Sequence, residues 1–153
     1  MNYEIVNLVE KQVVGLIKET TNENGRAIKD IGEMWGEFLA KAYYEKIKNR
    51  NNKKFIAVYT DYQGDFTDPY NFLICSEVIK SDNLESPLVS RKIPGGRYAK
   101  FVIKGDVKKS VQEFWSELWK MNLDRRYSCD FEEYQNNSND IENQEIHIYI
   151  SLN

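Results

Sequence analysis

The sequence predicts an α+β protein made of two similar halves, each with the order strand, strand, helix, strand, strand. Three observations support this fold class. Alternating apolar residues mark several extended segments, one segment in each half has apolar residues at helical spacing, and polar or glycine-containing stretches separate the segments. With 153 residues, of which 41% are apolar and 13% aromatic, the chain can bury one core. We therefore expect a single domain over residues 1–153, with half-domains at about 1–80 and 86–153.

In the first half, residues 3–9 and 11–18 are predicted to be strands, and a polar loop follows them. Residues 26–48 are predicted to form an amphipathic helix, since their apolar side chains recur every three or four positions. Residues 55–62 and 71–79 are then predicted as strands, joined by a stretch rich in turn-forming residues.

The second half repeats this order, with strands predicted at 88–93, 97–104, 128–134 and 145–152 and a helix at 107–121. Pro94 restricts Ile93 to extended geometry, and Gly95-Gly96 allow a tight turn, which is typical of a hairpin. Each predicted helix has a tryptophan four residues before a large apolar residue. These pairs are Trp35 with Leu39 and Trp115 with Trp119.

Charge and composition exclude several classes of protein. The net charge of −3 and the pI of about 5.3 disfavour nucleic-acid binding through a broad basic surface. No apolar run has the features of a signal peptide or the length of a membrane span, so we expect no membrane partner. Cys75 and Cys129 are too few for a disulfide scaffold, and we expect a reduced, cytoplasmic setting.

Motifs for cofactor and metal chemistry are missing from the sequence. Gly95-Gly96 belongs to neither a GxGxxG nor a Walker pattern, and no GxSxG elbow occurs. One histidine and two distant cysteines do not make a zinc site. We therefore expect no cofactor and no metal, and a Cys129–His147 dyad is disfavoured because Cys129 faces away from Glu132.

Two adjacent glutamates in the predicted strand 128–134 must point in opposite directions. Alternation places Glu132 and Tyr134 on one face and Phe131 and Glu133 on the other. A carboxylate among aromatic rings loses hydration, and a cationic ligand would restore the balance. Glu132 is therefore a candidate binding residue, with a surface glutamate as the alternative interpretation.

The second half resembles the GyrI-like effector-binding domains, small-molecule-sensing modules found alone or fused to AraC-type and MerR-type regulators. The resemblance covers nearly the whole chain and rests on Ile93-Pro94, Gly96-Arg97-Tyr98, Trp115, Phe131-Glu132-Glu133-Tyr134 and the strand beginning Glu145-Ile146. It implies two pseudo-twofold-related β-β-α-β-β half-domains with antiparallel sheets and a ligand cleft between them. Such units could enclose the cleft by pairing the sheet faces that their helices leave free.

The resemblance also implies a set of binding residues. Glu132 corresponds to the glutamate at the floor of the family's pocket. His147 occupies the position where the family usually has a tyrosine, which is a departure that introduces a group titrating near neutral pH. The expected ligand-binding residues are Glu132, His147, Tyr59, Tyr62, Tyr70, Phe72, Trp115 and Tyr134. Other large aromatic residues are expected to belong to the core, namely Trp35, Phe38, Phe114 and Trp119.

Three functions are compatible with these features. The first is a stand-alone protein that binds a hydrophobic, cationic or aromatic small molecule, as sensor or sequestering module, with no catalytic residue and with a separate transcription regulator as a possible partner. The second is a hydrolase of electrophilic cyclopropane-type compounds, in which Glu132 would act as base on water and His147 or a tyrosine would assist. The third is a protein-binding module of the gyrase-inhibitor type. We expect the first.

Overall fold

The computed structural model describes residues 1–136 and 140–153, and it confirms the predicted α+β class. Part of the polar stretch between the last two strands lies outside these ranges. The described elements are β1 (Glu4–Leu8), β2 (Lys11–Thr20), a short 3-10 turn (Glu23–Gly25), α1 (Arg26–Ala40), α2 (Tyr43–Lys46), β3 (Phe55–Thr60), β4 (Tyr70–Val78), β5 (Val89–Ile93), β6 (Gly96–Gly105), α3 (Val107–Leu118), β7 (Cys129–Tyr134) and β8 (Gln144–Ser151).

Each predicted strand is present, and its limits lie within two residues of the prediction. The helix predicted at 26–48 is interrupted instead. α1 ends at Ala40, Ala42 adopts a left-handed backbone with φ of 53°, and the chain resumes as the single turn α2. This conformation is unfavourable for a residue with a Cβ atom, and apolar spacing alone does not reveal it.

The strands form one antiparallel sheet in the order β1-β6-β8-β7-β3-β4-β2-β5. This order is symmetric about the β3–β7 pair. If each strand of one half is exchanged with its equivalent in the other, the same order is obtained in reverse. The two halves are therefore related by an approximate twofold in topology, as predicted, and they join edge to edge at β3 and β7.

The halves also exchange their first strands. β1 pairs with β6 of the second half, and β5 pairs with β2 of the first half. The hairpin indicated by Ile93-Pro94-Gly95-Gly96 is therefore not formed, because β5 and β6 pair with different strands. The turn instead directs the chain from one part of the curled sheet to another, and the Tyr98 hydroxyl donates a hydrogen bond of 2.6 Å to the Pro94 carbonyl across it.

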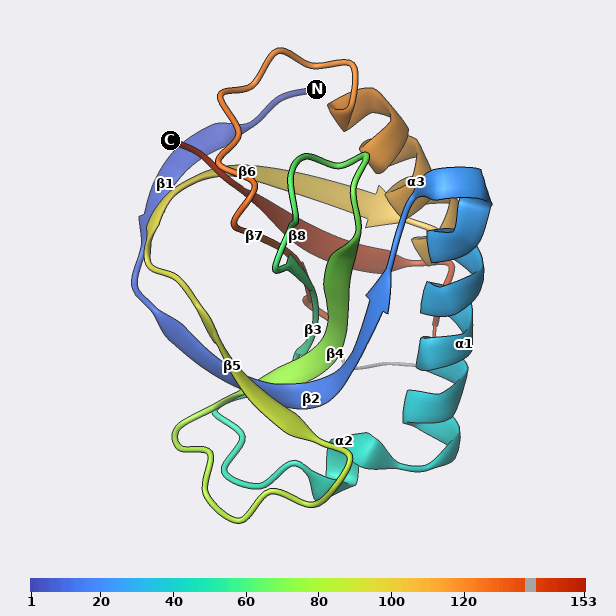
Figure 1. The fold of residues 1–153 in the computed structure, drawn as a ribbon, viewed down its shortest axis with the longest axis vertical. Helices are drawn as coiled ribbons and strands as arrows, with labels where there is room; N and C mark the ends of the chain where they lie inside the picture. Colours follow the sequence, from blue (N-terminus) through green and yellow to red (C-terminus); the bar gives the residue numbers. More distant parts are fainter. Residues whose placement is uncertain (137–139) are drawn as a thin grey trace.

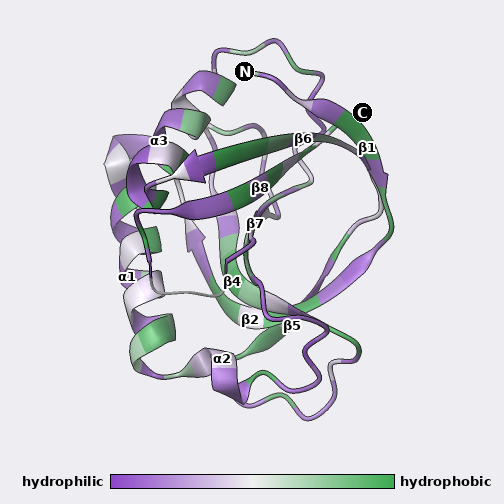
Figure 2. Cartoon of the chain, turned by 180° about the vertical axis from the view of Figure 1, so that it is seen from behind, coloured by the Kyte–Doolittle hydropathy of each residue, from purple (hydrophilic) through white to green (hydrophobic). Residues whose placement is uncertain are grey.

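The sheet has a core on each face. α1 and α3 cover one face, as Figure 1 shows, and they bury Met34, Phe38, Phe114 and Leu118 against it. On the other face the strands curl around a second apolar cluster that includes Phe131. Figure 2 shows hydrophobic stretches along β6 and β8 and mixed colouring along both helices, as expected for helices with one buried side.

Within residues 1–136 and 140–153, each helix is too short or too polar to cross a membrane.

Candidate functional site

Glu132 lies near the centre of the sheet, on the face that the helices cover. Its neighbours across the sheet are Ala57 on β3 and Ile148 on β8, and only 1% of Glu132 is exposed. The strand alternation that separated Glu132 from Glu133 in the sequence is present in the structure, since Tyr134 packs in the helix-side core and Phe131 in the opposite one.

Three aromatic side chains donate hydrogen bonds to the Glu132 carboxylate. The Tyr59 hydroxyl on β3 and the Trp115 indole Nε1 on α3 both contact Oε2, at 2.6 and 2.8 Å. The Tyr134 hydroxyl on β7 contacts Oε1 at 2.9 Å. We refer to these four residues, Glu132, Tyr59, Trp115 and Tyr134, as the Glu132 cage.

Burial determines the electrostatics of the cage. Loss of hydration raises the pKa of Glu132, and the hydrogen bonds from Tyr59, Trp115 and Tyr134 partly oppose this rise. Burial and the nearby carboxylate raise the pKa of Tyr59 and of Tyr134 well above the ordinary phenol range. The two phenols therefore stay protonated and act as donors. Among the described residues, no basic side chain forms an ion pair with Glu132.

Further rings surround the cage. The Tyr59 ring lies 4.8 Å from Trp115, 5.1 Å from Phe72 and 5.9 Å from Tyr70, measured between ring centroids. The structure thus brings five of the other expected binding residues around Glu132: Tyr59, Tyr70, Phe72, Trp115 and Tyr134.

Trp35 is a site residue that sequence reasoning missed. It is half-buried on α1, and its ring packs edge-on against Tyr134 at 5.5 Å. We had expected Trp35 to be an ordinary core residue. Its equivalence to Trp115 in the repeated pattern was a signal that could have found it, because equivalent helix positions face the same junction between the halves.

Tyr62 takes part in a second polar centre on the same face. Its hydroxyl donates to Asp130 Oδ2 at 2.8 Å, and the buried Arg125 guanidinium donates to the same oxygen at 2.7 Å. The backbone N–H and hydroxyl of Ser151 donate to Asp130 Oδ1 at 2.8 and 3.1 Å. The Tyr62 ring contacts Tyr70 at 5.5 Å, so this centre borders the cage without including Glu132.

The structure does not bring His147 to Glu132, contrary to our expectation. In the β7–β8 register Glu132 pairs with Ile148, and Glu133 pairs with His147. Paired residues of antiparallel strands share a face, so His147 lies on the side opposite Glu132. There its Nε2 atom lies 2.8 Å from Glu145 Oε2. His147 therefore cannot assist a base at Glu132.

Trp119 also differs from the expectation that it belongs to the core. It is 39% exposed at the C-terminal end of α3, and its ring stacks on Phe66 with a centroid distance of 5.5 Å and an interplanar angle of 11°. Phe38 and Phe114 are buried, as predicted.

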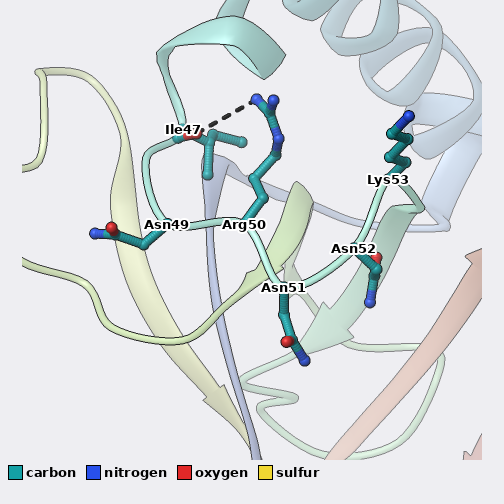
Figure 3. Close-up of a pocket in the computed structure, with 6 residues that line it drawn as sticks. All are labelled: Ile47, Asn49, Arg50, Asn51, Asn52 and Lys53. Atoms are coloured by element: carbon teal, nitrogen blue, oxygen red, sulfur yellow. Dashed lines mark hydrogen bonds between the residues drawn. The ribbon is translucent and has the colours of Figure 1, made fainter.

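The cage lies between the sheet and the helices, whereas we had expected a cleft between the sheet faces that the helices leave free. Those faces instead curl around the second apolar cluster. Two surface hollows lie elsewhere and include none of the four cage residues. One follows α2 (Figure 3), where Arg50 bonds the Ile47 carbonyl at 3.4 Å, and the other lies between α3 and the N-terminus. Glu132, Tyr59 and Tyr134 are all buried, so the cage is closed in this structure.

Comparison with known proteins identifies the family. The profile of Cass2, described as an integron-associated effector-binding protein, matches residues 4–152. The chain belongs to the Cass2 family. Within this GyrI-like group, YobU of Bacillus subtilis (strain 168), whose name describes a candidate transcriptional regulator, is 26% identical over 157 residues, which span 97% of this chain and 96% of YobU.

Solved structures of similar fold agree with this assignment to the Cass2 family. The integron cassette protein VCH_CASS2 from the mobile metagenome of Vibrio cholerae has a TM-score of 0.80 and 26% identity, covering 99% of this chain and 95% of its own. SAV2435, solved bound to tetraphenylphosphonium, also has a TM-score of 0.80, with 17% identity and coverage of 100% and 94%. At that identity the likeness shows the shared fold.

Proposed function

We propose that this Cass2-family protein binds flat or bulky lipophilic organic cations at the Glu132 cage, in order to sense or sequester them. The observation that carries the proposal is a buried carboxylate with three aromatic hydrogen-bond donors and, within residues 1–136 and 140–153, no basic side chain paired with it. A buried carboxylate is costly without an opposite charge. A cationic ligand would supply that charge.

The contrast with Asp130 supports this assignment. Both carboxylates are almost fully buried on the same face of β7, but Asp130 has the Arg125 guanidinium as an internal partner. The protein thus neutralises one buried acid itself and leaves the other to aromatic donors. We infer that Glu132 is the acid available to a ligand.

The rings around Glu132 favour a particular kind of cation. Aromatic faces attract cations, by about 0.5–2 kcal/mol for each contact, and they also bury apolar surface well. Cations with delocalised charge and aromatic substituents use both effects. SAV2435, a protein of the same fold, is bound to tetraphenylphosphonium, which is a cation of this class.

The decisive test replaces the charge of Glu132 and keeps its shape. In Glu132→Gln the amide oxygen can still accept hydrogen bonds, and the amide nitrogen can donate to a rotated Tyr134 hydroxyl. We expect this variant to weaken the binding of tetraphenylphosphonium by about 1–3 kcal/mol, because one member of a desolvated charge pair is lost. Isothermal titration calorimetry measures the change.

The neighbouring glutamate supplies a matched control. Glu133 is also buried but lies on the opposite face, so Glu133→Gln should leave affinity unchanged. The neutral ligand triphenylphosphine oxide should bind wild type and Glu132→Gln equally. If cationic and neutral ligands lose the same affinity in Glu132→Gln, Glu132 does not recognise charge and the proposal is wrong.

A further inference from the structure

Phe66 and Trp119 form a partly exposed stacked pair just outside the Glu132 cage. Phe66 lies in the loop between β3 and β4, and Trp119 follows the last residue of α3. Their rings are nearly parallel, at 11°, with centroids 5.5 Å apart. An aromatic pair of this kind adds little to the stabilisation that its buried area provides, so the stack holds the loop to the helix only modestly.

Both members of the stack are connected to the cage. Trp119 lies one helical turn beyond Trp115, whose indole donates to Glu132, so the two indoles lie on neighbouring positions of one helix face. On the loop side, the Phe66 carbonyl accepts a hydrogen bond of 2.8 Å from Asn22. The carbonyl oxygen of the Asn22 side chain accepts one of 2.7 Å from the Tyr70 hydroxyl, and the Tyr70 ring contacts Tyr59.

The opposite side of the cage is held by a larger set of contacts. There the Trp35 ring meets Phe38, Phe55 and Tyr134 at 5.5–6.3 Å, and Phe55 also packs against Tyr44. Regions with fewer buried apolar contacts open at lower free energy. At the end of α3, by contrast, Phe66 is the one aromatic ring that contacts Trp119 within the described residues. The junction between the end of α3 and the β3–β4 loop is therefore the easier one to open.

Backbone conformation marks where this side could move. Asp61, the first residue after β3, has a φ of 53°, and Tyr127, just before β7, has a φ of 55°. Left-handed conformations at residues other than glycine persist only when surrounding contacts hold them. The Tyr127 ring contacts Tyr62 at 5.9 Å, so the two strained segments meet beside the loop that carries Phe66.

We propose that Phe66 and Trp119 form the entrance to the Glu132 cage and control how fast ligands reach it. A cation would separate the β3–β4 loop from α3 where Phe66 stacks on Trp119, and would then displace Trp115 from the Glu132 carboxylate. How often this opening forms would set how fast a cation reaches and leaves Glu132. This inference rests on the proposed function of the cage.

The first experiment needs no ligand. Solvent exchange of the Trp115 indole N–H, followed by NMR, reports how often the cage opens, because this proton is bonded to Glu132 in the closed state. We expect Phe66→Ala and Trp119→Ala each to raise the exchange rate about tenfold, since each removes the stack. Leu39→Ala is the matched control, because Leu39 follows Trp35 on α1 as Trp119 follows Trp115 and is 59% exposed. Exchange rates that equal wild type in both stack variants would overturn the entrance.

The second experiment measures ligand access. In stopped-flow binding of rhodamine 6G, both stack variants should raise the association and dissociation rates together, with the dissociation constant changed by less than about threefold. A bismaleimide cross-link in Phe66→Cys/Trp119→Cys should slow both rates, because it ties the β3–β4 loop to the end of α3. The native cysteines are buried and do not compete for the reagent. If wild type binds no cation, the proposed function is wrong, and the exchange rate of the Trp115 indole N–H still shows whether the stack controls opening of the cage. If binding depends on Glu132 but no rate changes, only the entrance is wrong.

Discussion

At the scale of single residues, β7 holds two buried acids with different partners. Asp130 bonds Arg125, Tyr62 and Ser151, and it ties the segment before β7 to the last strand. Glu132, two positions later, accepts hydrogen bonds from aromatic side chains alone in the part of the chain that the structure describes. The Asp130 carboxylate therefore has a structural role, whereas the Glu132 carboxylate stays available to a ligand. The difference is that Asp130 has a basic side chain within bonding distance.

The first prediction concerns the pH dependence of stability. Burial raises the pKa of Glu132 above its ordinary value of 4.5, so the folded state favours the protonated carboxyl. Its contribution to stability is fully present below pH 4.5 and is lost as the pH rises through the raised pKa. The free energy of unfolding of wild type relative to Glu132→Gln should therefore fall as the pH rises through this window, as urea unfolding would measure.

In the difference between the unfolding free energies of wild type and Glu132→Gln, the contributions of the other titrating groups cancel. The Thr20 hydroxyl lowers the pKa of Asp30, which acts in the opposite direction, but it does so in both proteins. A difference between wild type and Glu132→Gln that stays constant from pH 4 to 8, about the range in which a raised carboxyl pKa lies, would contradict a perturbed Glu132.

The second prediction concerns the Arg125–Asp130 pair. Arg125→Met leaves the Asp130 carboxylate buried without a cation and should cost about 3–5 kcal/mol of stability. Arg125→Met/Asp130→Asn should recover much of that loss, because the uncompensated charge is removed as well. Urea unfolding of the two single variants and the double variant measures the coupling. If the losses simply add, the pair does not interact as the 2.7 Å contact indicates.

At the scale of elements, glycine has different roles in β2 and α1. Gly15 lies where β2 passes between β4 and β5, and a Cβ atom there would clash with the Ile74 carbonyl and lie 2.5 Å from the Cα of Cys75. Gly32 on α1 faces open space, with nothing within 4 Å of a Cβ. The first glycine permits close packing of the backbone, and the second is replaceable.

The third prediction compares these two positions. Gly15→Ala should destabilise the fold by about 3 kcal/mol, because the neighbouring strand backbone must move. Gly32→Ala should stabilise it by about 0.5–1 kcal/mol, since alanine loses less conformational entropy in a helix. Thermal unfolding followed by circular dichroism compares both variants with wild type. Equal effects at the two positions would show that the close approach at Gly15 is absent in solution.

At the scale of the whole molecule, the two halves depend on one another. β1 completes the sheet of the second half beside β6, β5 completes that of the first half beside β2, and β3 and β7 join the halves at the centre. Neither half contains all the strands that cover its own core. The repeated sequence pattern therefore does not correspond to two independent folding units.

The fourth prediction follows from this exchange. Fragments 1–80 and 81–153 should each be largely unfolded alone, because each lacks the partner strand supplied by the other. An equimolar mixture should regain β-sheet signal in circular dichroism and the tryptophan emission of the intact chain. The intact chain should unfold in one transition by both probes. A fragment that folds cooperatively by itself would refute the mutual dependence.

The sequence by itself determined the α+β class, the limits of the strands and the opposite directions of Glu132 and Glu133. These features depend on short-range geometry, namely the twofold alternation of a strand and the 3.6-residue turn of a helix, which apolar residues report directly. The aromatic environment of Glu132 was predicted through the resemblance to GyrI-like domains, with Tyr59, Trp115 and Tyr134 among the named residues.

Only the tertiary structure decided how these elements combine. The exchange of β1 and β5, the position of His147 behind the sheet and the exposed stack of Phe66 on Trp119 each depend on which distant segments meet. Local periodicity shows that alternate residues of a strand face opposite sides, but the side that each strand turns to the helices depends on its register with neighbours far away in the chain. The resemblance to GyrI-like domains implied that His147 lies beside Glu132, whereas the register of β7 with β8 places it on the other face.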